Sequence, residues 1–235
     1  MCVAIYKPAG VKVDKGTLLA CFQTNPDGAG FAWFDGKEIH LSKGYFVFED
    51  WARQIDKIPL DAPAMLHARI TTHGETSPAN CHPFIISSNP KLLEAQDAEV
   101  GKGLVAMHNG MIHGLAPVNS VDAKHSDTMH FIAQYLASLT KKVNILDGLG
   151  KKVVEKSIDG SKFAIMQADN GRVVLYGGWT KDSETGAYFS NMLWRNYRHD
   201  ERKYAWTVDE EYYERHYGNY RQMTWYEEEL GGDEK

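Results

Sequence analysis

The chain has 235 residues, of which 43% are hydrophobic and 24% are charged, and its formal net charge is −5. This composition is typical of a globular protein and lacks the basic excess of nucleic-acid-binding proteins. No apolar run approaches the ~20 residues of a membrane-spanning helix, and no charged-then-apolar leader opens the chain. The cysteines Cys2, Cys21 and Cys81 are odd in number, without the spacing of a disulfide framework. We therefore expect a cytoplasmic protein with free thiols that binds neither nucleic acid nor membranes.

The first part of the chain predicts strands punctuated by glycine and proline turns. Asp35-Gly36 between two apolar runs is a strong signal for a two-residue hairpin turn. Trp51, Ile55 and Ile58 recur at helical spacing. The expected elements are a strand at 3–6, a short helical or irregular piece at 17–23, a glycine-punctuated loop at 25–30, a hairpin of 31–34 and 38–41, a helix at 49–57 and a strand at 63–70.

The second part mixes helices with further strands. Ser126 is a good helix N-cap, and Asp127 suits the first turn that follows. Asp169-Asn170-Gly171 tolerates the positive φ of a tight hairpin turn. The expected elements are a polar loop at 71–83, a charged surface insertion at 91–103, a strand at 104–107, a helix from 126, a second helix at 143–155, a hairpin of 163–167 and 172–176 and a strand at 189–194.

Strands outnumber helices in this reading, and the helices lie mid-chain between groups of strands. This order favours an α+β layered fold over a doubly wound parallel sheet. Residues 2–194 form the expected main domain. Residues 195–235 are rich in Tyr, Glu and Arg and poor in aliphatic residues, so we interpret them as a C-terminal extension that is partly disordered or docks on a partner.

Histidines are frequent in the middle of the chain, but their spacing is not that of a zinc site. They lie at His67, His73, His82, His108, His113, His125 and His130. None forms a His-x-x-x-His pair, the spacing that places two ligands on one helix face. We expect structural or pocket-lining histidines, no metal and no cofactor.

Cys2 is the strongest candidate for a nucleophile. If Met1 is removed, Cys2 becomes the N-terminal residue and carries both a thiol and a free α-amine, which titrates near pH ~8. The amine can then help to take the thiol proton. A cysteine at position two is, on its own, more often a small buried apolar residue, so its role depends on what surrounds it.

Polar stretches at 25–30, 69–74, 108–110 and 126–128 follow strand ends or open a helix, and such positions can converge on one site. Asn109-Gly110 offers a side-chain amide and a backbone N–H for an oxyanion. Arg69 can bind a carboxylate bidentately, and Asp127 can pair with an ammonium group. Each of these residues also has a purely structural interpretation. Asn109-Gly110 is a common sequence for a turn, and an acid such as Asp127 stabilises the first turn of a helix without any further role.

The ordered set of these motifs resembles class II (N-terminal-nucleophile) glutamine amidotransferases over about residues 2–194. The resemblance is closest to small stand-alone members, some of them encoded by bacteriophages. The motifs are Cys2, Asn-Pro-Asp-Gly-Ala-Gly at 25–30, His-Ala-Arg-Ile-Thr-Thr-His-Gly at 67–74, His-Pro-Phe at 82–84, His-Asn-Gly at 108–110 and Ser-Asp-Thr at 126–128.

The resemblance implies the Ntn-hydrolase fold, a four-layer αββα sandwich in which two antiparallel sheets lie between helix layers. It also implies that this protein is a glutaminase whose nucleophile forms a γ-glutamyl thioester and releases ammonia. The implied site consists of Cys2 as nucleophile, Asn109 and Gly110 as the oxyanion hole, Arg69 for the α-carboxylate of glutamine, Thr72 and His73 as pocket residues, and Asp127 for the α-amine.

Two features depart from the family pattern and leave alternatives open. No acceptor domain follows residue 194, so the ammonia is expected to pass to a partner synthase. Residues 85–103 have no obvious family counterpart, and a different substrate is possible if they cover the site. The alternatives are an N-terminal cysteine hydrolase of another amide, such as a γ-glutamyl peptide, and a catalytically silent binding module of the same fold.

Overall fold

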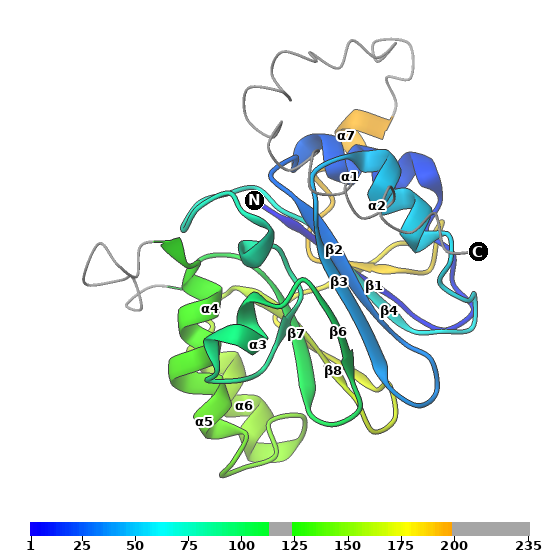
Figure 1. The fold of residues 1–235 in the computed structure, drawn as a ribbon. Helices are drawn as coiled ribbons and strands as arrows, with labels where there is room; N and C mark the ends of the chain where they lie inside the picture. Colours follow the sequence, from blue (N-terminus) through cyan, green and yellow to red (C-terminus); the bar gives the residue numbers. More distant parts are fainter. Residues whose placement is uncertain (113–123, 199–235) are drawn as a thin grey trace, which may run out of the picture. The chain divides into compact units, whose positions relative to one another are not determined.

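The computed structural model describes residues 1–112 and 124–198 and shows two antiparallel sheets with helices on their outer sides (Figure 1). The larger sheet contains β1 (Val3–Lys7), β2 (Ala29–Phe34), β3 (Ile39–Tyr45), β4 (Ala64–Ala68), β6 (Asp97–Val100), β10 (Thr180–Lys181) and β11 (Tyr188–Phe189). The smaller sheet contains β5 (Phe84–Ile85), β7 (Leu104–Asn109), β8 (Lys162–Gln167) and β9 (Val173–Tyr176). Within the described residues, the strand orders are β10-β11-β1-β4-β2-β3-β6 and β5-β7-β8-β9.

The helices fall into two groups, one for each sheet (Figure 1). Helices α1 (Lys15–Thr24) and α2 (Phe48–Ile55) cover the larger sheet, while α4 (Asp127–Phe131), α5 (Ala137–Leu139) and α6 (Gly148–Ser157) cover the smaller one. The remaining helical pieces are η1 (Pro78–Asn80), α3 (Pro90–Glu94), the π-helical turn η3 (Ile132–Leu136) and α7 (Arg195–Arg198). No helix in the described part of the chain is long and apolar enough to span a bilayer.

Three apolar clusters separate the four layers, and strand alternation explains how one strand serves two of them. Successive side chains of a strand point to opposite faces of the sheet. On β4, Leu66 accordingly joins the cluster beneath α1 and α2, whereas Met65 joins the cluster between the two sheets. A third cluster lies between the smaller sheet and α4–α6. This arrangement confirms the α+β layered fold expected from the order of elements and the αββα sandwich that the family resemblance implies.

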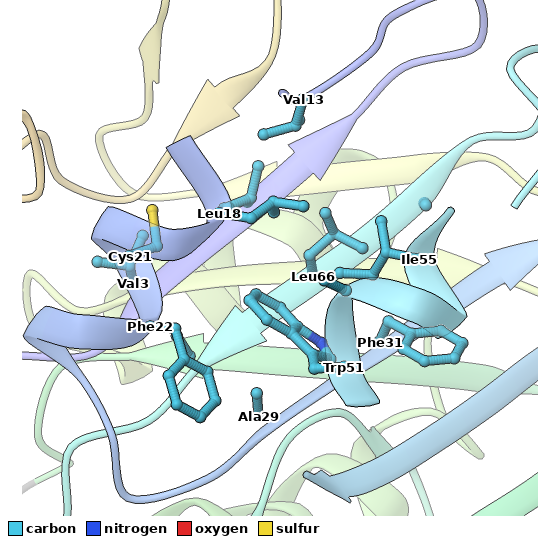
Figure 2. Close-up of a cluster of buried hydrophobic side chains, with 14 of the residues drawn as sticks. Val3, Val13, Leu18, Cys21, Phe22, Ala29, Phe31, Trp51, Ile55 and Leu66 are labelled. Atoms are coloured by element: carbon cyan, nitrogen blue, oxygen red, sulfur yellow. The ribbon is translucent and has the colours of Figure 1, made fainter. Parts of the chain in front are cut away.

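The cluster beneath α1 and α2 is centred on Trp51, whose side chain is fully buried. Figure 2 shows the indole beside Leu66, with Phe22 and Phe31 on either side of it in this view. The Trp51 and Phe22 rings lie 6.0 Å apart between centroids, and the indole N–H donates to the Gly30 carbonyl oxygen over 3.3 Å. Trp51 therefore joins α2 to the outer face of the larger sheet. Cys21 is also fully buried in this cluster, so its thiol is part of the core.

Replacing Trp51 by alanine is expected to lower the free energy of unfolding by about 3–5 kcal/mol, because it leaves a large cavity under α2. Urea unfolding followed by far-ultraviolet circular dichroism measures this change. The matched variant Trp51→Phe keeps most of the packing and loses the indole hydrogen bond, so its cost should be clearly smaller. Equal stability of Trp51→Ala and wild type would contradict this view of the core.

The largest difference from the expected elements lies between residues 85 and 103. We expected a charged surface insertion at 91–103, but the chain there forms α3 and then β6, which pairs with β3 at the edge of the larger sheet. Asp97 and Glu99 are exposed, while Ala98 and Val100 pack onto the cluster between the sheets. The charged residues thus occupy the outward positions of an edge strand in which polar and apolar residues alternate. A strand of four residues is too short for this alternation to be recognised in the sequence.

Other element boundaries also differ from those expected. The hairpin between β2 and β3 pairs Phe34 with Ile39, so its turn spans 35–38 and is longer than two residues. Ala29 and Gly30 belong to β2 rather than to a loop, because β4 provides a pairing partner on their other side. Helix α6 begins at Gly148, later than expected. Among the described residues the last strand is β11, which ends at Phe189 and does not extend to 194, and the short strand β10 was not expected.

The end of the chain is described only as far as residue 198. Contacts within the chain divide it into the units Met1–Tyr197 and Arg198–Lys235. The extension expected at 195–235 therefore lies mostly outside the described residues, and its role stays a prediction.

Candidate active site

Cys2 lies directly before the N-terminal end of β1 and faces the side of the larger sheet that packs on the smaller sheet. In β1, Ala4 belongs to the cluster between the sheets, and Cys2 lies two residues before it, so strand alternation directs both side chains to the same side. The half-buried thiol lies against the chain that follows β4. Ile70 N–H contacts Sγ over 3.4 Å, and Sγ is 3.4 Å from the Ile70 carbonyl oxygen.

Burial raises the pKa of the Cys2 thiol, since a thiolate is poorly solvated there. The Ile70 N–H, then the positive charge of Arg69 and then the N-terminal amine oppose this shift without cancelling it. The resting group at neutral pH is therefore the thiol. Chemistry at Cys2 needs a base that removes the proton as the nucleophile reacts.

Alkylation of Cys2 in the chain that retains Met1 is expected to reach its half-maximal rate at a higher pH in the folded protein than in urea. The thiolate is the reactive form, and a raised pKa moves its appearance to higher pH. Peptide mass spectrometry after short iodoacetamide pulses at a series of pH values measures the midpoint at Cys2. A folded midpoint at or below the unfolded one would contradict the burial effect.

Arg69 follows β4 directly and is buried, with 2% of its surface exposed. Its guanidinium donates to the Thr71 hydroxyl over 2.8 Å, the His73 carbonyl over 3.0 Å and the Glu75 carbonyl over 3.2 Å. These bonds use three of the five N–H groups of an arginine side chain. Arg69 therefore shapes the loop that follows it, a role that the sequence did not indicate.

The glycine-punctuated stretch at 25–30 lies against the same loop. The Asp27 carboxylate accepts the Thr71 N–H over 2.7 Å, and the Arg69 N–H donates to the Gly28 carbonyl over 2.8 Å. The predicted pocket residues Thr72 and His73 are exposed on the loop that Arg69 holds. The structure thus brings two of the polar stretches together beside Cys2.

Asn109 is the last residue of β7 in the smaller sheet and is buried, with 4% exposed. Its Nδ2 donates to the Ser190 hydroxyl oxygen over 2.9 Å, while its buried Oδ1 has no partner among the described residues. Gly110 follows with φ +144°, and a Cβ at this position would collide with the side chain of Ser161. Only glycine fits this turn, which keeps the backbone close to the start of β8.

Asp127 opens α4 and is buried, with 6% exposed. One carboxylate oxygen accepts the Ile112 N–H over 2.8 Å, and the other accepts the Thr128 N–H over 2.8 Å. The Asp127 carboxylate therefore connects the segment after Gly110 to the start of α4. An acid that only stabilised the N-terminus of its own helix would not need the bond to Ile112. The Thr128 hydroxyl also contacts His108 Nδ1 over 2.7 Å and so joins α4 to β7.

Three buried histidines lie near the site, and two of them, His67 and His82, stack on each other. The rings of His67 and His82 lie 4.1 Å apart, and those of His82 and His108 lie 6.4 Å apart. Burial lowers the pKa of His67 to about 3 and that of His108 to about 4, and it also lowers the pKa of His82, so all three are neutral near pH 7. Within the described residues, the potential metal ligands that converge lie elsewhere, at Asp35 and Glu38 in the turn between β2 and β3 and at His40 in β3.

Sequence reasoning missed two residues that contact this site, Ser190 and Asn191. The Ala4 N–H donates to the Ser190 hydroxyl oxygen over 2.9 Å, and Asn191 Nδ2 donates to the Cys2 carbonyl over 2.7 Å. The only local signal was the apolar strand expected at 189–194, and it gave no reason to single out either polar residue. Their importance depends on the pairing of β1 with β11.

The chain shows distant structural likenesses to known proteins. No family model and no curated protein matches the chain. It is similar to a structure described as the allosteric regulatory enzyme of purine biosynthesis, with 16% identity, a TM-score of 0.49, and coverage of 80% of this chain and 41% of that one. It is also similar to glutamine phosphoribosylpyrophosphate amidotransferase from B. subtilis in complex with ADP and GMP, with 16% identity, a TM-score of 0.48, and coverage of 84% and 43%. The chain thus spans about two fifths of the length of each of these proteins. At this sequence identity neither similarity indicates an activity.

Proposed function

We propose that this protein hydrolyses the side-chain amide of glutamine through a thioester on Cys2, as class II glutamine amidotransferases do. The observation that carries the proposal is a pair of groups at neighbouring ends of β1 and β7, one strand from each sheet. A half-buried thiol lies at the start of β1, and the buried Asn109 amide lies at the end of β7, where its Nδ2 bonds to the Ser190 hydroxyl that also binds the Cys2 strand. A nucleophile and an oxyanion donor are the two groups that amide cleavage needs most.

The reaction begins after loss of Met1, when the Cys2 α-amine accepts the thiol proton. Sγ then attacks the carboxamide carbon, and Asn109 Nδ2–H and the Gly110 N–H stabilise the oxyanion. The C–N bond breaks, and the amine returns the proton to the departing ammonia. Water adds to the thioester, the C–S bond breaks, and glutamate and the free thiol are released.

The substrate is held at its amino-acid end. Arg69 binds the α-carboxylate with the N–H groups that its loop does not use, and Asp127 accepts a hydrogen bond from the α-ammonium group in addition to its backbone donors. Thr72 and His73 line the pocket on the loop that Arg69 holds. A free carboxylate and a free ammonium together favour glutamine over amides inside a peptide.

The proposal is tested with the purified protein from which Met1 has been removed, as verified by intact mass. We expect it to release glutamate and ammonia from glutamine, and a chloroketone analogue of glutamine to modify Cys2 alone among the three cysteines. A chain that neither makes glutamate nor reacts at Cys2, even when cell extract supplies possible partners, contradicts the proposal. A chain that retains Met1 in its mature form favours the silent binding module instead.

Replacing Arg69 by lysine separates glutamine from other amide substrates. Lysine keeps the charge but loses the planar fork that binds a carboxylate bidentately, so we expect kcat/KM for glutamine to fall at least about tenfold, mainly through KM. Activity on an otherwise identical amide without the α-carboxylate should change much less. Equal losses on both substrates would indicate that Arg69 acts only through its own loop.

The ammonia, in this proposal, passes to a partner synthase, since free release would waste it. The experiment is co-purification of the full chain and of a chain lacking residues 196–235. A partner that supplies an ammonia acceptor and raises glutamine turnover would support the proposal, whereas turnover that no acceptor enzyme affects would speak for a free-standing glutaminase.

A further inference from the structure

The two residues after β11 hold the beginning of the chain in place. The Ser190 N–H donates to the Ala4 carbonyl over 2.9 Å, and the Ala4 N–H donates back to the Ser190 hydroxyl oxygen over 2.9 Å. Asn191 Nδ2 donates to the Cys2 carbonyl over 2.7 Å, and Asn191 Oδ1 accepts the Leu193 N–H over 3.1 Å. The main chain on both sides of Val3 is therefore fastened to a segment far away in the sequence.

The Ser190 hydroxyl also reaches the opposite sheet. It lies 2.9 Å from Nδ2 of Asn109, and this contact joins β1 to the end of β7 through one buried oxygen. A serine hydroxyl has one proton to donate and two lone pairs that accept. The Ala4 N–H and Asn109 Nδ2 both donate to this oxygen in the orientation described, so the hydroxyl proton is not used by either contact.

The unpartnered end of the Asn109 amide indicates a role for that proton. In the orientation described, Nδ2 faces Ser190, and the buried Oδ1 has no partner among the described residues. Half a turn of the amide exchanges the two atoms. Oδ1 then accepts the Ser190 proton, and the N–H groups of Nδ2 point to the position without a partner, where an oxyanion can receive them.

We propose that Ser190 and Asn191 are positioning residues: Ser190 turns the Asn109 amide so that its N–H groups meet the oxyanion, and Asn191 fixes the main chain of Cys2. This inference rests on the proposed glutamine hydrolysis. Because the nucleophile and the oxyanion donor lie on different sheets, one segment that binds both sets their separation. Neither residue touches the substrate, so each acts through the residue that it holds.

A purely structural role for Ser190 makes different predictions. A buried hydroxyl that only satisfies the Ala4 N–H would affect stability when removed and leave the chemistry of folded molecules unchanged. A hydroxyl that orients Asn109 would lower kcat with little change in KM, because the oxyanion exists only after the nucleophile has attacked. Its effect would also vanish once Asn109 itself is gone.

The test is a double-mutant cycle of Ser190→Ala and Asn109→Ala on glutamine hydrolysis, with the folded fraction checked by circular dichroism. We expect Ser190→Ala to lower kcat about 10- to 100-fold, somewhat less than removal of an oxyanion donor, with KM within about threefold. The double variant should be no more than about threefold slower than Asn109→Ala alone. Ser157→Ala is the matched control, since that hydroxyl bonds to Tyr135 and the Val153 carbonyl in the helix layer.

Two further variants keep the test decisive if Ser190→Ala folds poorly. Ser190→Cys keeps a weaker donor of similar size and should recover part of kcat, and Asn191→Ala should lower kcat and slow the modification of Cys2 by the chloroketone analogue. Unchanged kcat in both Ser190→Ala and Asn191→Ala would overturn the inference. So would a double variant whose loss of kcat equals the product of the losses in Ser190→Ala and Asn109→Ala. In either case an active wild type would still support the proposed function. A wild type without glutaminase activity would instead remove the proposed function, and the inference with it.

Discussion

Replacing Cys2 by alanine is expected to abolish glutamine hydrolysis, with a rate at least about 10⁴-fold below that of the wild type. The nucleophile forms the covalent bond on which both half-reactions depend, and loss of such a residue in hydrolases of this kind typically costs that much or more. The variant keeps the α-amine of the N-terminal residue after Met1 is removed. The measurement is glutamate release under saturating glutamine.

The control for this experiment is a second cysteine whose side chain lies in a different apolar cluster from the one that Cys2 faces. Cys21 is fully buried in the cluster beneath α1 and α2, so Cys21→Ala removes a thiol of the same kind without touching Cys2. We expect this variant to keep wild-type activity within a few-fold. Loss of activity in Cys21→Ala with retention in Cys2→Ala would reject the assignment of the nucleophile.

Replacing Asn109 by alanine has the second largest expected effect, a fall in kcat of about 10²- to 10³-fold. This is the usual cost of losing one donor from an oxyanion hole. KM should change little, because the amide N–H groups bind the tetrahedral oxygen more strongly than the planar substrate. Steady-state kinetics on glutamine separate the two parameters.

Two companion variants show whether the loss comes from the donor. Asn109→Asp keeps the size of the side chain but replaces the N–H groups with a carboxylate, so it should be at least as slow as Asn109→Ala. Asn144→Ala removes an exposed amide that bonds to Asp147 and should leave kcat unchanged. An active Asn109→Asp enzyme would place the oxyanion donor elsewhere.

Local signals account for much of the fold that could be predicted. The turn of Asp169-Asn170-Gly171 and the cap at Ser126 depend on residues within a few positions of each other, and both are present in the structure. The positive φ that a tight turn requires and the side-chain oxygen that a helix start requires are chemical properties of single residues. Such features can be recognised without knowing what packs against them.

The errors arose where a short segment depends on a distant partner. Strand β6 is four residues long and carries two exposed acids, and it forms a strand because β3 offers it an edge. Gly30 belongs to β2 because β3 and β4 pair with it from both sides. The deciding partners, β3 for β6 and β4 for Gly30, are distant in the sequence, so no local pattern could decide these cases.

The candidate site divides in the same way. The types of group in the candidate site, a thiol at position 2, an arginine at 69 and an amide at 109, could be predicted from the order of motifs along the chain. How these groups are held depends on the folded chain: the Arg69 guanidinium bonds to its own loop, and Ser190 joins the Cys2 strand to Asn109. Hydrogen bonds between residues more than 80 positions apart exist only once the sheets have paired, since the unfolded chain has no means of bringing their donors and acceptors together.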